Sequence, residues 1–91
     1  NILHKNLKIL NQNKYDFIFY VAGVDIHFED RLGKLKVTDV GVNKRDQIVI
    51  ENFNRKNIPL CGVLGGGYNK SFEKLVELHS MLHKNCAEII R

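Results

Sequence analysis

The apolar residues of this chain fall into five segments separated by polar or glycine-rich stretches. Leucines and isoleucines recur at helical spacing over residues 3–10, and two continuous apolar runs follow at 17–21 and 58–64. Residues 38–54, between the two runs, and residues 72–90, after the second run, each place apolar side chains on one stripe of a helix. The pattern predicts the order helix, strand, helix, strand, helix.

The two apolar runs suit the strands of a parallel sheet. Both are continuous and not alternating, as expected for strands buried on both faces. Pro59 opens the second run, where its missing N–H is least costly. Thr38 is the expected N-cap of the helix between the strands, and Asn69 or Ser71 that of the last helix. Since a stable sheet usually needs three or more strands, we expect these two to belong to a larger sheet that is covered on both faces.

Each apolar run is followed by a short polar interruption, at residues 22–33 and 65–69. The carboxyl ends of parallel strands meet at one edge of a sheet, which is where open α/β sheets bind their ligands. We therefore expect the carboxylate of Asp25 and the phenol of Tyr68 to converge on one site. Residues 23–37 also form a long charged loop, typical of functional loops in compact domains.

Composition narrows the class of protein. The 91 residues are 44% hydrophobic and 26% charged, which is ordinary for a soluble globular chain, and no apolar stretch approaches the length of a membrane span. The net charge of +4 comes from lysines spread along the chain, which favours a solvated surface over direct nucleic-acid binding. Cys61 and Cys86 are expected to be reduced, buried thiols, and the expected location is cytoplasmic, or nuclear in a eukaryote. Because the chain begins with Asn1 and not Met, we expect a segment of a longer protein.

The two interruptions resemble the C-terminal portion of the zinc-dependent histone deacetylase family. Residues 22–25 (Ala-Gly-Val-Asp) with 30–33 (Asp-Arg-Leu-Gly) look like its second-aspartate loop, and 64–69 (Leu-Gly-Gly-Gly-Tyr-Asn) like its glycine–tyrosine loop. Residues 38–46 are similar to the helix after the first loop. The resemblance runs from about Tyr15 to the end, and its Asp-Arg-Leu-Gly form is closest to the bacterial and class IV branch.

The resemblance implies a fold and a reaction. The fold class is α/β, of the arginase/deacetylase type: a helix–strand–helix–strand–helix segment of a three-layer α/β/α domain with a parallel sheet. Residues 1–91 would be an incomplete, C-terminal segment of one such domain. The implied reaction is zinc-dependent hydrolysis of acetyl-lysine or a related acylated amine, on an acetylated protein or a small molecule.

The resemblance also assigns roles to residues. Asp25 matches the zinc ligand, and Tyr68 the tyrosine that donates a hydrogen bond to the substrate carbonyl. Gly66 and Gly67 match the backbone that shapes the substrate pocket. The family's tandem histidines and its second metal-binding loop should lie upstream, so this chain is expected to need the upstream part of its domain and to be inactive alone.

Several side chains also have simpler interpretations. Asp25 could cap a turn, and Asp30 is expected to order its loop rather than act in catalysis. The pair Asp25 and His27 mimics a metal-binding motif, but the matching family position of His27 is no zinc ligand. His79 falls on the apolar stripe of the last helix and is expected to be a satisfied core histidine. That stripe is expected to be buried: Phe72, Leu75, Val76, Leu82, Cys86, Ile89 and Ile90.

Two other functions stay open. One is a non-catalytic, deacetylase-like remnant. The other is a nucleotide- or phosphate-binding module, because three glycines at 65–67 precede a helix whose N-terminus attracts anions. Their spacing fits neither a P-loop nor a dinucleotide fingerprint.

Overall fold

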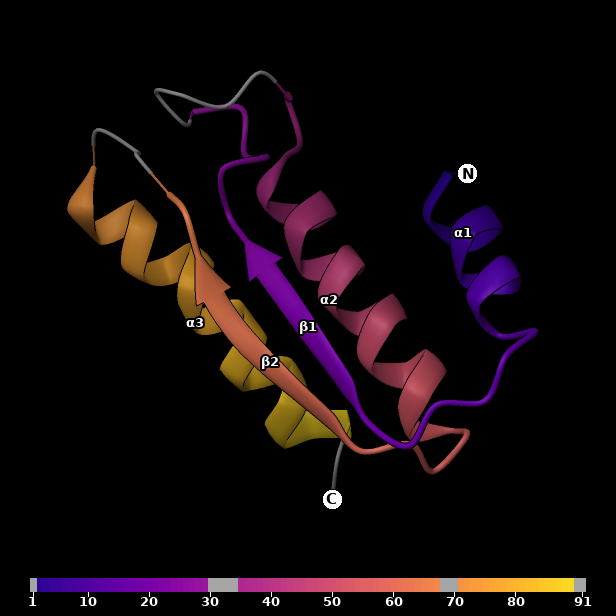
Figure 1. Cartoon of the computed structure of the whole chain (residues 1–91). Coiled ribbons are helices and arrows are strands. Elements are labelled where there is room, and N and C mark those ends of the chain that lie inside the picture. Colours follow the sequence, from indigo (N-terminus) through magenta and orange to yellow (C-terminus); the bar gives the residue numbers. More distant parts are fainter. Residues whose placement is uncertain (1, 30–34, 68–70, 90–91) are drawn as a thin grey trace.

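A computed structural model describes residues 2–29, 35–67 and 71–89 of the chain. The order of elements confirms the predicted α/β segment: α1 (Ile2–Leu10), β1 (Ile18–Gly23), α2 (Asp39–Asn54), β2 (Leu60–Gly65) and α3 (Phe72–Ile89). Figure 1 shows α2 and α3 flanking the two strands, with α1 on the side of α2 that faces away from α3.

The two strands are parallel neighbours, and α2 forms the crossover between them. Their register pairs Ile18 with Leu60 at one end and Gly23 with Gly65 at the other. Both strands therefore end at the same edge of the sheet, as the sequence predicts. The pairing continues one step further, because the N–H of Val24 donates to the carbonyl of Gly65 at 3.2 Å.

Local signals in the sequence set the ends of the helices. The hydroxyl of Thr38 accepts the N–H of Gly41 at 3.1 Å and caps α2, which confirms the prediction. Beyond the other end of α2, Asn57 adopts a left-handed conformation with φ of 57°, a conformation that asparagine tolerates and that often terminates helices. Ser71 caps α3 by accepting the N–H of Lys74 at 3.2 Å. Asn69 lies outside the described residues.

The core lies between one face of the sheet and the helices. Ala22 of β1 packs with Ile50 of α2 and Leu82 of α3, and further clusters lie on either side of this contact. The predicted apolar stripe of α2 is buried: Val42, Val49, Ile50 and Phe53. Truncating a buried aliphatic side chain of this kind to alanine costs about 2–5 kcal/mol.

The other face of the sheet is apolar and exposed. Phe19 and Val21 point away from the helices and are 73% and 70% exposed, and β2 adds the exposed Cys61 and Val63. The described residues therefore form two layers, and the expected third layer of helices stays a prediction. The prediction of a buried Cys61 is wrong, because its side chain belongs to this open face. We refer to Phe19, Val21, Cys61 and Val63 as the open face.

Two further expectations concern α3 and the cysteines. Phe72 and Val76 are 77% and 52% exposed, so the buried stripe of α3 is narrower than predicted. Both cysteines are free thiols, and Cys86 is partly buried. Of the helices that the structure describes, none has the length and apolar character required to cross a membrane.

Candidate functional site

Asp25 lies just beyond the end of β1, and its side chain is exposed. The residues around it are anchored. Val24 is 2% exposed and packs with Val42 and Leu78, while His27, two residues after Asp25, is fully buried. Among the described residues, none donates a hydrogen bond to the Asp25 carboxylate and none forms an ion pair with it. Within the described part of the chain, Asp25 thus presents an exposed carboxylate without a partner on a short segment held on both sides.

The glycine loop after β2 lies directly against Asp25. A Cβ placed on Gly66 would lie 3.4 Å from both Cβ and Cγ of Asp25. Gly66 has a φ of 61° and Gly67 a φ of 103°, conformations that favour glycine. A Cβ on Gly67 would clash with Leu75 at 2.6 Å and with Val24 at 2.8 Å. Only glycine therefore lets this loop pack onto the Asp25 segment and the start of α3.

A second group of side chains connects the end of β1 to α2. The guanidinium of Arg45 donates to the carbonyl of Gly23 at 2.5 Å and to Oδ1 of Asp46 at 3.0 and 3.1 Å. The hydroxyl of Tyr20 donates to the same Oδ1 at 2.6 Å. Burial, and then the bond to Asp46, raises the pKa of the Tyr20 phenol, which therefore stays protonated as a donor. These contacts hold the strand end immediately before Asp25.

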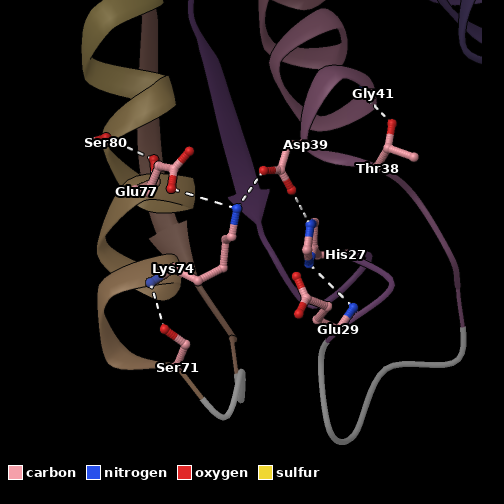
Figure 2. A network of polar contacts seen from close by, with 9 residues as sticks. All are labelled: His27, Glu29, Thr38, Asp39, Gly41, Ser71, Lys74, Glu77 and Ser80. Carbon is pink, nitrogen blue, oxygen red and sulfur yellow. Dashed lines mark hydrogen bonds and ion pairs between the residues drawn. The ribbon is translucent and has the colours of Figure 1, made fainter.

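A third group links the Asp25 segment to both neighbouring helices (Figure 2). Nε2 of His27 contacts Oδ1 of Asp39, and Nζ of Lys74 lies 2.6 Å from the other oxygen of that carboxylate. We call these three side chains the His27–Asp39–Lys74 bridge. The hydrogen bond from Lys74, followed by that from His27, lowers the pKa of the Asp39 carboxyl, and Asp39 in turn raises the pKa of Lys74.

Comparisons with known proteins show the family of the chain. A family model described as the histone deacetylase domain matches residues 2–82, which is most of the chain. The chain belongs to the histone deacetylase family. Over 75 residues it is 36% identical to histone deacetylase 2 of Arabidopsis thaliana, an alignment that covers 81% of this chain and 19% of the relative. Over 88 residues it is 40% identical to an uncharacterized protein of Picosynechococcus sp., covering 97% of this chain and 29% of that protein.

The chain therefore spans less than a third of the length of these two relatives. The matched region still includes every element from α1 to most of α3. The activity, the substrate and the metal of the whole protein are therefore proposals.

The predicted site residues have different outcomes. The structure brings Asp25 and Gly66 together and packs Gly67 behind them, while their roles in metal and substrate binding stay predictions. Tyr68 and Asp30 lie outside the described residues. The prediction of a satisfied His79 is wrong, because its buried Nδ1 has no hydrogen-bond partner among the residues that the structure describes.

The donor set fits a zinc site only in part. A catalytic zinc takes three protein ligands and keeps one position open. In residues 2–29, 35–67 and 71–89, no three histidine, cysteine or acidic side chains are grouped to hold a metal. Asp25 is exposed at the edge of the sheet and has no partner in the described part of the chain, so it suits one of the three positions. In a histone deacetylase built from this chain, the other two ligands would have to come from elsewhere.

Proposed function

We propose that this chain is the C-terminal part of a zinc-dependent deacetylase that hydrolyses acetyl-lysine or a related acylated amine. The observation that supports it most is the close approach of Gly66 to Asp25, at the edge where both parallel strands end. This is where a ligand crevice is expected in an open α/β sheet. The match to the histone deacetylase domain supports the reaction class.

Asp25 would supply one carboxylate ligand to the metal. Its segment suits this role because Val24 and His27 are buried on either side, so the backbone that carries the exposed carboxylate is held in place. A bound zinc would polarise the amide carbonyl of the substrate and activate a water molecule. The two remaining ligands and the general base would come from the upstream part of the domain.

Tyr68 would donate its hydroxyl proton in a hydrogen bond to the substrate carbonyl oxygen. A phenol has an ordinary pKa of about 10, so it remains a donor at neutral pH. Gly66 and Gly67 would line the acyl pocket with backbone, since a side chain on Gly66 would crowd Asp25 and one on Gly67 would clash with Val24 and Leu75. An acetylated protein and a small acylated amine are both suitable substrates for such a site. We also propose that the protein is located in the cytoplasm.

The experiment that tests this function is turnover by the full-length protein that carries this chain. We expect it to release acetate from an acetyl-lysine peptide, to lose this activity with a chelator and to regain it with zinc. A folded protein without turnover on any acylated amine would instead favour the non-catalytic remnant. Protection from heat by a nucleotide would favour the phosphate-binding alternative.

A further inference from the structure

Each side chain of the His27–Asp39–Lys74 bridge has a polar partner. Nδ1 of His27 accepts a hydrogen bond from the backbone N–H of Glu29 at 3.3 Å. Nε2 of the same ring then donates to Oδ1 of Asp39. The other oxygen of Asp39 accepts from the ammonium of Lys74. The Asp39 carboxylate therefore connects His27 to Lys74.

The bridge joins three segments that are distant in the sequence (Figure 2). His27 belongs to the segment of Asp25, Asp39 is the first residue of α2, and Lys74 is the third residue of α3. Backbone bonds strengthen the first connection, because Phe28 donates to the carbonyl of Val37 at 2.9 Å, and Val37 to that of Ile26 at 3.0 Å. Since α3 follows the glycine–tyrosine loop in the chain, the bridge links the two loops that carry the candidate site.

The two anchors of Asp25 differ in kind. Val24 is held by apolar packing, which resists exposure to water but is not directional. His27 is held by hydrogen bonds at both ring nitrogens, which define the direction of the ring and of the backbone beside it. Apolar packing therefore buries the segment, and the bridge orients it.

We propose that the His27–Asp39–Lys74 bridge positions the Asp25 carboxylate relative to Gly66 and Gly67, with Lys74 as a positioning residue for the metal site. This inference rests on the proposed function, because it takes Asp25 to be a zinc ligand. Lys74 would thus influence the metal site although it is distant from Asp25 in the sequence.

Because the bridge is partly exposed, its effect on the position of Asp25 can be measured separately from its effect on the stability of the fold. The side chains of Lys74 and Asp39 are 27% and 33% exposed. Ion pairs near the surface contribute only about 0–1 kcal/mol to the free energy of unfolding. Removal of the Lys74 ammonium should therefore leave the fold almost as stable, while it frees one end of the bridge.

The test compares three variants of the full-length protein. Lys74→Met removes the ammonium and keeps the aliphatic stem, Lys74→Arg keeps a cation that can reach the carboxylate, and Lys84→Met makes the same change at an exposed lysine of the same helix. Zinc affinity is measured by competition with a chelator, and stability by thermal unfolding of the zinc-free protein. We expect Lys74→Met to weaken zinc binding about 10-fold, the lower end of the effect of residues behind metal ligands. Lys74→Arg should recover most of that affinity, and Lys84→Met should match wild type. All variants should unfold at similar temperatures.

Two results would overturn the inference in distinguishable ways. If wild type binds zinc and deacetylates, but Lys74→Met keeps the wild-type zinc affinity, the bridge has no positioning role and the proposed function stands. The same conclusion follows if Lys74→Met lowers both the zinc affinity and the temperature of unfolding strongly, and Lys74→Arg does not restore the zinc affinity. If wild type itself binds no zinc, the proposed function fails and this inference fails with it.

Discussion

Asp25 and Gly66 lie so close together at the carboxyl edge of the sheet that a side chain on Gly66 would contact Asp25. A methyl group on Gly66 would touch both Cβ and Cγ of Asp25 at 3.4 Å. Each residue follows the paired strand ends closely, since Gly23 lies opposite Gly65 in the register. The placement of the Asp25 carboxylate therefore depends on the small residues around it.

Gly23→Ala should displace the Asp25 carboxylate without disrupting the fold. A Cβ on Gly23 would lie 2.9 Å from Oδ1 of Asp25, and the flexible end of that side chain can move away. We expect zinc binding by the full-length protein to weaken by about 10-fold or more, as when residues supporting a metal ligand are changed. The free energy of unfolding should change by less than about 1 kcal/mol, as for substitutions that only shift an exposed side chain.

Gly65→Ala is the matched control for this change. It lies opposite Gly23 in the sheet, but a Cβ there would meet only Val21 at 3.6 Å and the Cα of Gly23 at 4.0 Å, which are ordinary contacts. Its zinc affinity should equal that of wild type. Equal zinc affinity in both alanine variants would show that the crowding at Asp25 does not affect the metal.

Asp39→Asn should change how stability depends on pH. Hydrogen bonds from Lys74 and His27 lower the pKa of Asp39 in the folded protein. Its contribution is therefore present above the unfolded pKa of about 3.9, and is lost as the pH falls through the lower folded pKa. The asparagine amide does not titrate, so wild type should unfold at a higher temperature near neutral pH, and the difference should shrink in acid. Thermal unfolding of both proteins over a pH series measures this, and a constant difference would contradict it.

Much of the fold could be predicted from the sequence because its signals are local. The periodicity of α2, its cap at Thr38 and the cap of α3 at Ser71 each depend on neighbours within a few residues. The meeting of the two loops also followed, since parallel strands joined by one helix must end at the same edge. Side-chain contacts between segments that are distant in the sequence have no local signal and could not be predicted in this way.

The bridge was missed because each of its members has a sufficient local explanation. The sequence shows His27 only as a mimic of a metal-binding motif, and Asp39 and Lys74 only as polar residues near helix starts. The fold shows that His27 and Asp39 share a partly buried contact and that Lys74 completes it. The prediction that Cys61 and Phe72 are buried was wrong for a related reason. An apolar pattern does not indicate which face of a strand or helix is covered.

The isolated 91-residue chain should fold poorly and should be inactive. The open face leaves large apolar side chains such as Phe19 in water, and a two-stranded sheet has edges that promote aggregation. We expect no cooperative unfolding transition in urea and no release of acetate from acetylated peptides. The full-length protein is the control. A sharp transition together with zinc-dependent turnover by this chain alone would contradict the prediction.

Tyr68→Phe should affect the chemical step and spare the metal. The substitution removes one hydroxyl and keeps the ring, so zinc content should not change. Loss of a single donor to a developing oxyanion lowers kcat by about 10²–10³-fold. An interaction that forms in the transition state should lower kcat more than it raises KM. Steady-state kinetics on the full-length protein measure both, and a kcat within a few-fold of wild type would show that Tyr68 serves packing alone.

The most direct test of the account is the zinc content of Asp25→Ala in the full-length protein. The carboxylate is exposed and has no partner among the described residues, so its removal should hardly change the temperature of unfolding of the zinc-free protein. We predict that purified Asp25→Ala retains little zinc after dialysis and has no measurable deacetylation, while wild type retains one zinc per chain. Stoichiometric zinc and near-normal turnover in Asp25→Ala would contradict the assignment of Asp25 as a metal ligand.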